Sequence, residues 1–118
     1  MRSVHRMALV ASRAGLAALG VAVAGLASAS EASAQLALGK RLFTQSATPA
    51  CALCHTLKDA EAEGAVGPIL DELKPDSARV MKALRNGLGQ MPSYRDKLSE
   101  AEIQALAAYV SKAVGSAR

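Results

Sequence analysis

The stretch Cys51-Ala52-Leu53-Cys54-His55 decides the fold, because it is a C-x-x-C-H motif. This spacing is the attachment signature of c-type haem. Two thiols three residues apart on a tight turn can each add to one of the two vinyl groups of a haem. The histidine directly after the second cysteine is then held under the iron as an axial imidazole. The motif therefore predicts one haem, attached covalently through Cys51 and Cys54, with His55 as an iron ligand.

Two other kinds of site use cysteines at this spacing. A thiol–disulfide oxidoreductase places its reactive thiolate at a helix start after a strand, and no strand-like pattern precedes Cys51. A structural zinc site needs four ligands, and beyond residue 34 the chain has no Cys or His outside the motif. The oxidoreductase stays open as an alternative that a colourless protein would favour.

Residues 1–34 have the pattern of a secretory signal peptide. The first 13 residues are basic without an acid, residues 14–29 are uncharged and apolar, and Ala32-Ser33-Ala34 supplies small residues for cleavage. We predict cleavage after Ala34 and export to the periplasm. The 16-residue apolar stretch is shorter than the ~20 residues that span a bilayer, but an uncleaved anchor is the competing interpretation.

The predicted domain, residues 35–118, is small and carries 11 basic and 9 acidic residues. The whole chain of 118 residues has a net charge of +4 and only three aromatic residues, Phe43, Tyr94 and Tyr109. So few aromatic residues argue against a stacking platform for nucleic acid. A domain of this size also has little core of its own, so we expect a bound group to fill its interior.

Helical periodicity predicts three helices and an all-α class. The first covers Leu36–Gln45 and ends before Pro49, and the second covers residues 76–88, with Asp76 as its N-cap. The third begins at Ser99, whose S-x-x-E sequence is a capping box. No stretch alternates apolar and polar residues for long enough to predict a strand.

About thirty residues lie between the first two helices, with one possible helical turn near 59–63. A loop this long in a small domain is expected only where it serves a function or wraps something. The thin core points the same way, so the chain is expected to surround a large apolar group. Six apolar residues are the predicted walls of that pocket: Val66, Ile69, Leu70, Leu73, Leu84 and Leu88.

A methionine is the expected second axial ligand, because no other histidine remains beyond residue 34. Met81 lies on the apolar stripe of the second helix, where packing in the core is the ordinary role. Met91 lies in a glycine-rich loop and precedes Pro92, which fixes the backbone beside it. We therefore favour Met91. If neither methionine bound, the iron would be open to small molecules, as in a haem enzyme.

Short motifs on either side of C-x-x-C-H lie in a fixed order along the chain. They are G-x-x-x-F at Gly39 and Phe43, Gly67-Pro68-Ile69-Leu70, Met91-Pro92, and L-x-x-Y at Leu106 and Tyr109. From about Leu38 to Val114 the sequence resembles a class I c-type cytochrome. The resemblance implies three main helices wrapped around a covalently attached haem, with the first and last helices packed closely.

The same resemblance implies roles for particular residues. It predicts that the Pro68 carbonyl accepts a hydrogen bond from the second ring nitrogen of His55, which fixes the ring. Met91 corresponds to the methionine ligand, and Gly67 to the glycine before the proline. The chain lacks a long central insert, so it is similar to the short bacterial members and to small cytochromes that accept electrons from periplasmic sulfite dehydrogenases.

The predicted function is periplasmic electron transfer, without an enzyme activity of the chain itself. The carrier would shuttle electrons from a dehydrogenase to an oxidase or another cytochrome, with no nucleic acid and no stable membrane insertion. The alternative is a tightly bound haem c subunit of an oxidoreductase complex such as sulfite dehydrogenase. A thioether ligand and an apolar pocket favour ferrous iron, so we expect a positive reduction potential.

Seven basic residues are a possible docking ring for an acidic partner. Acidic residues are scattered among them, and such charges are often only solvated, so the sequence leaves this open. They are Lys58, Lys74, Arg79, Lys82, Arg85, Arg95 and Lys97.

Overall fold

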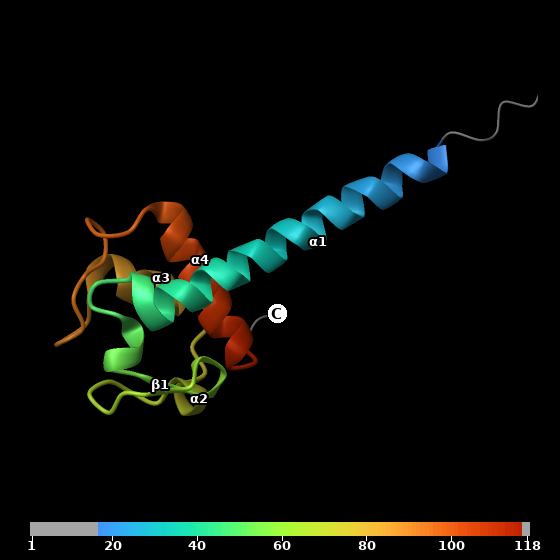
Figure 1. The fold of residues 1–118 in the computed structure, drawn as a ribbon. Helices are drawn as coiled ribbons and strands as arrows, with labels where there is room; N and C mark the ends of the chain where they lie inside the picture. Colours follow the sequence, from blue (N-terminus) through green and yellow to red (C-terminus); the bar gives the residue numbers. More distant parts are fainter. Residues whose placement is uncertain (1–16, 117–118) are drawn as a thin grey trace, which may run out of the picture.

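The computed structural model describes residues 17–116, and most of these residues are helical (Figure 1). The all-α class is therefore confirmed. The elements in chain order are α1 (Ala17–Arg41), a π-helical turn (Leu42–Ser46), a 3-10 turn (Cys51–Leu53), β1 (Thr56–Leu57), a second 3-10 turn (Lys58–Ala60), β2 (Ala62–Glu63), α2 (Leu70–Leu73), α3 (Ser77–Asn86) and α4 (Glu100–Ala113).

The predicted start of the first helix at Leu36 is wrong, because α1 already begins at Ala17. The preceding residues are rich in alanine, the best helix former, and contain no proline, so nothing interrupts the helix. The predicted end is confirmed, since the π-helical turn ends at Ser46 and Ala47 has extended backbone. The early part of α1 projects away from the other elements (Figure 1).

The predicted cleavage site after Ala34 lies inside α1. Residues 25–35 are all exposed, whereas Gly39, Leu42 and Phe43 are buried. Cleavage there would consequently remove none of the buried residues between positions 25 and 116. The first 16 residues, with the basic start of the predicted signal, lie outside the described residues.

The caps of α3 and α4 are confirmed. An Asp76 carboxylate oxygen accepts a hydrogen bond from the Arg79 backbone N–H at 2.8 Å. The Ser99 and Glu102 side chains each accept from the other's backbone N–H, which completes the capping box. Helix α3, which corresponds to the second predicted helix, ends at Asn86, two residues before the predicted end. It ends there because Gly87 leaves the helical conformation with φ +70°.

The expectation that no strand forms is wrong in one place. Thr56–Leu57 and Ala62–Glu63 pair as an antiparallel two-stranded ribbon. Strands of two residues are too short to produce an alternating pattern. The long loop also contains the 3-10 turn at Lys58–Ala60, which overlaps the start of the helical turn predicted near residues 59–63. It further contains α2, which the periodicity did not predict.

The crossing of α1 with α4 forms the main apolar core. A Cβ at Gly39 would overlap the Ala105 carbonyl oxygen and lie 2.5 Å from the Tyr109 Cβ, so only glycine permits this approach. Beside it the Phe43 and Tyr109 rings meet edge to face, with centroids 6.1 Å apart. The close packing that the G-x-x-x-F and L-x-x-Y motifs predict is therefore present.

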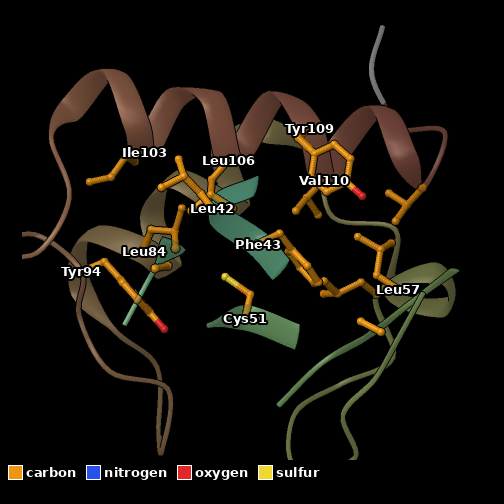
Figure 2. Close-up of a cluster of buried hydrophobic side chains, with 14 residues drawn as sticks. Leu42, Phe43, Cys51, Leu57, Leu84, Tyr94, Ile103, Leu106, Tyr109 and Val110 are labelled. Carbon is orange, nitrogen blue, oxygen red and sulfur yellow. The ribbon is translucent and has the colours of Figure 1, made fainter. Parts of the chain in front are cut away.

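The core extends from this crossing to the cysteine motif. Figure 2 shows side chains of α4 facing Leu42, Phe43 and Leu84, with Cys51 pointing into the cluster between Phe43 and Tyr94. The motif is thus fixed to the core by one of its own cysteines.

Candidate functional site

Residues 51–55 form the tight turn that the C-x-x-C-H chemistry requires. The backbone N–H groups of Cys54 and His55 donate to the Cys51 carbonyl oxygen at 3.1 and 2.9 Å. Cys51 is buried and Cys54 half-buried, and both are free thiols. This turn brings the two thiols and the imidazole together within one segment.

The environment of Cys51 disfavours the oxidoreductase alternative. Burial raises the pKa of its thiol to about 11. A nucleophilic thiol of a disulfide oxidoreductase needs the opposite shift, toward a stable thiolate. Among residues 17–116, no three His, Cys, Asp or Glu side chains converge as a metal site.

The imidazole of His55 is oriented by the Gly67-Pro68 segment. Its Nδ1 lies 2.9 Å from the Pro68 carbonyl oxygen; a carbonyl only accepts, so Nδ1 is the donor and Nε2 is the ring nitrogen left for a metal. The Gly67 N–H donates to the Cys54 carbonyl oxygen at 2.6 Å, which ties this segment to the motif. A neutral imidazole held through Nδ1 is the usual form of a metal-binding histidine.

Two glycines have no room for a side chain next to the motif. A Cβ at Gly67 would lie 2.6 Å from His55 Cε1, so the backbone packs directly on the imidazole. A Cβ at Gly64 would lie 2.6 Å from both the Cys54 carbonyl carbon and the His55 nitrogen. Sequence reasoning missed Gly64, because no motif or periodicity marks it.

Met91 lies on a separate loop after α3 and is not part of this hydrogen-bonded group. It is half-buried against the core, and its backbone pairs with Leu88 through two hydrogen bonds of 3.0 Å. Met81 is also half-buried, on α3, and its sulfur accepts a hydrogen bond from the Arg85 guanidinium at 3.8 Å. Met91 therefore lies in a loop and Met81 lies on a helix, as the sequence predicts for each.

Tyr94 connects the methionine loop to the segment before the motif. Its buried hydroxyl donates to the Pro49 carbonyl oxygen at 2.7 Å, and burial raises its pKa to about 12. Pro49 lies two residues before Cys51, and Tyr94 three residues after Met91. This contact fixes the two loops relative to each other. The sequence revealed Tyr94 only as one of few aromatic residues.

The predicted pocket walls divide into two kinds. Leu70 and Leu84 are buried, whereas Val66, Ile69 and Leu88 are 69%, 42% and 73% exposed and Leu73 is also exposed. Large apolar side chains that are exposed together, rather than scattered singly, are typical of a surface that binds another group. An open depression of about 620 Å³ lies among Thr56, Ala65, Gly67, Pro68, Ile69, Glu72 and Leu73. The depression lies next to His55, because Gly67 in its wall packs on the imidazole, and Ile69 and Leu73 give it an apolar part that a haem would cover.

A second depression, of about 570 Å³, lies between α1 and α4. Its lining includes neither the cysteine motif nor the Gly67-Pro68 segment that contacts His55, and four of its six α1 residues belong to the predicted signal peptide. It therefore has no part in the site. Between residues 17 and 116, no helix has both the length and the hydropathy needed to cross a membrane.

The folded C-x-x-C-H turn, the histidine bonded to a proline carbonyl and the close helix crossing define a class I c-type cytochrome. Residues 34–110 match the family model of cytochrome c oxidase, cbb3-type, subunit III, and the chain belongs to this family of cytochrome c domains. Accordingly, it carries haem c, and the two cysteines Cys51 and Cys54 are its attachment points.

Two known proteins resemble the chain. The crystal structure of the c-type cytochrome SorU from Sinorhizobium meliloti matches with a TM-score of 0.68 and 54% identity, over 70% of this chain and 94% of that one. Chloroplastic cytochrome c6 of Chlamydomonas reinhardtii is 34% identical over 70% of this chain and 57% of its own length. The chain thus spans little more than half of that curated relative.

Proposed function

We propose that this protein is a periplasmic electron carrier with a single haem c bound between His55 and Met91. When bound, the haem supplies a one-electron ferric–ferrous couple. The chain itself supplies the ligands, the apolar surroundings and the docking surface, and catalyses no further reaction. The hydrogen bond between His55 and Pro68 is the observation that carries the proposal.

His55 is the proposed ligand on one side of the iron. The Pro68 carbonyl holds the Nδ1 proton, so the Nε2 lone pair is directed away from that bond and toward the metal. The Gly67 backbone lies against the ring and prevents it from turning. These two contacts would keep the ligand in one orientation in both oxidation states, and a carrier that does not rearrange transfers electrons with little reorganisation.

Met91 is the proposed ligand on the other side. Its loop is hydrogen-bonded through Tyr94 to the segment before Cys51, which supports an approach of Met91 to a group attached to the motif. Met81 is the weaker candidate, because its sulfur already accepts a hydrogen bond from Arg85 within α3. A thioether ligand raises the reduction potential relative to a second imidazole.

The proposed location follows from residues 1–34, which would direct export and then be removed. The exposure of residues 25–35 supports removal, since the buried core begins only at Gly39. The electron donor would be a periplasmic dehydrogenase, and the acceptor an oxidase or another cytochrome. The 54% identity to the bacterial SorU cytochrome supports a place among short bacterial carriers. Within that group, the sequence is similar to the small cytochromes that accept electrons from sulfite dehydrogenases.

Charge is distributed unevenly between the two sides of the site. Residues 59–72, next to the His55 side, carry five acidic and no basic residues, a net −5; residues 74–97, which include Met91, carry six basic and two acidic residues, a net +4. Such segregation orients an approaching partner by its field. We therefore propose that an acidic partner docks on the side of residues 74–97.

Salt dependence tests this docking face. Lys82→Gln should lower the rate of electron transfer to an acidic partner at low ionic strength, and the difference from wild type should shrink as salt screens the charges. Glu61→Gln, which changes one charge within the acidic segment, is the matched control and should not slow the reaction. Equal slowing by both variants would contradict an oriented docking face.

Potentiometric titration of the exported protein tests the central proposal. We expect one reversible one-electron step with a clearly positive midpoint potential, because the thioether and the apolar surroundings favour the ferrous state. A midpoint well below zero would contradict Met91 ligation. Rapid turnover of peroxide, or tight binding of small gases, would instead indicate an open iron position and a haem enzyme.

A further inference from the structure

The C-terminal end of α3 is hydrogen-bonded to residues 93–95, which follow Met91 and Pro92. We propose that Ser93 and Arg95 are positioning residues that hold the methionine loop on this helix end and so keep Met91 on the iron. This inference rests on the proposed function, in which Met91 is the axial ligand.

The loop closes the end of α3 by binding its last carbonyl groups. The final carbonyls of any helix lack partners within the helix. In α3 the Leu84 carbonyl accepts from the Tyr94 backbone N–H at 2.7 Å. The Arg85 carbonyl accepts both from the Ser93 hydroxyl at 2.6 Å and from the Arg95 guanidinium Nε at 3.2 Å. Three consecutive residues of the loop are thereby fixed to one turn of helix.

The two side chains also bind each other and the next residue of the helix. The Arg95 backbone N–H donates to the Ser93 hydroxyl oxygen at 3.3 Å. The second arm of the Arg95 guanidinium donates to the Asn86 side-chain oxygen at 2.9 Å. A planar guanidinium makes this two-armed contact, which a lysine cannot reproduce. Ser93, Arg95 and the end of α3 consequently form one closed network.

The opposite side of the loop has little room to move. Gly87 has φ +70°, and a Cβ there would lie 2.8 Å from the Met91 carbonyl oxygen and 3.0 Å from the Ser93 nitrogen. Leu88 and Met91 are bonded to each other through their backbones. Met91 thus lies between a tight turn on one side and the Ser93–Arg95 network on the other, so releasing that network should free its side chain to leave the iron.

Competition by added imidazole measures this directly. Imidazole displaces a weakly held methionine from ferric haem, and its apparent affinity reports how firmly Met91 is held. We expect the double variant Ser93→Ala/Arg95→Gln to bind imidazole roughly tenfold more tightly than wild type, as the loss of modest hydrogen bonds predicts. Ser93→Thr, which keeps the hydroxyl, should restore wild-type affinity at that position. Lys112→Gln removes one positive charge from an exposed position of α4 and should have no effect.

The controls separate failure of this inference from failure of the proposed function. If Met91→Ala binds imidazole far more tightly but the double variant behaves as wild type, Met91 ligation stands and the positioning role is wrong. A double variant that loses stability to denaturant without any change in imidazole affinity also overturns the role. If Met91→Ala leaves the imidazole affinity unchanged, Met91 is not the axial ligand, and the proposed function is wrong on that point before the positioning role is tested. Should the double variant not fold, Ser93→Ala and Arg95→Lys test each contact alone, with the same expected direction.

Discussion

The helix crossing and the haem-attachment side of the molecule are stabilised in different ways. At the crossing of α1 and α4, Phe43, Leu106 and Tyr109 are almost completely buried by the chain itself. On the attachment side, Val66 and Leu88 remain about seven-tenths exposed. The first region is a complete core, whereas the second needs a further apolar group to cover it. The packing of the chain on itself therefore specifies the first region, and the haem is needed to complete the second.

Loss of covalent attachment should break the second region and, with it, the fold. We expect Cys51→Ser/Cys54→Ser to lose most of its helical circular dichroism after export, because a domain of this size buries too little apolar surface alone. Leu53→Gln, which changes an exposed residue between the same cysteines, should stay folded. A double variant that retains its helices and melts cooperatively would show that the chain needs no haem to fold.

Crowding the helix crossing should break the first region. Gly39→Ala places a methyl group against the Ala105 carbonyl and Tyr109, and we expect it to lower the free energy of unfolding by about 3 kcal/mol. The matched control, Ala37→Val, adds bulk at an exposed position of α1 and should cost only about 0.5 kcal/mol. Denaturant titration of both variants measures the difference, and similar losses would contradict a tight crossing at Gly39.

Gly67→Ala sharpens the comparison within the attachment side. The new methyl group would lie 2.6 Å from His55 Cε1, so we expect the imidazole to shift and the stability to fall by about 1–2 kcal/mol. The ring resonances of His55 in NMR spectra of the ferrous protein report the shift. Ala65→Gly, two residues away, should leave those resonances in place. Unchanged resonances in Gly67→Ala would mean that Gly67 does not orient the ligand.

Asp59 joins the helix crossing to the loop of the attachment side and should give the smallest effect. The Tyr109 hydroxyl donates to its carboxylate at 2.7 Å and Lys40 lies 3.3 Å away, and the hydrogen bond from Tyr109, followed by Lys40, lowers the pKa of this carboxyl. A lowered folded-state pKa stabilises the fold above about pH 4, the unfolded value, and the gain is lost as the pH falls through the folded value.

Asp59→Asn should therefore be less stable than wild type at pH 7, by less than about 1 kcal/mol because the carboxylate is half exposed. The difference in unfolding free energy should shrink as the pH approaches 3. Asp96→Asn removes the same charge from an exposed turn and should show no comparable change. A difference that grows at low pH would have the wrong sign for this account.

The sequence predicted the chemistry of the site better than the boundaries of its helices. C-x-x-C-H, Gly67-Pro68 and the two capping sites are local signals, since each depends on residues within a few positions of one another. The predicted start of the first helix, Leu36, was wrong, because the alanine-rich sequence before it contains no signal that interrupts a helix. The two-residue strands and Gly64 were not predicted, because they depend on how the long loop folds back on the motif.

The hydrogen-bond network of Ser93 and Arg95 also could not be predicted from the sequence. Its acceptors on α3 are the Arg85 backbone carbonyl and the Asn86 side chain, eight to ten residues before the donors, and no local motif marks either of them. Only the three-dimensional path of the loop shows that they are bonded. The sequence thus predicted which loop carries the candidate methionine ligand, and the structure showed how that loop is held.

The near-infrared spectrum of the ferric protein tests the central claim most directly, with Met91→Ala and Met81→Ala as a matched pair. A sulfur–iron band should be present in wild type, retained in Met81→Ala and lost in Met91→Ala, while the visible bands stay resistant to acid–acetone extraction in all three. A band that survives Met91→Ala would contradict ligation by Met91, and extractable colour would contradict covalent attachment through Cys51 and Cys54.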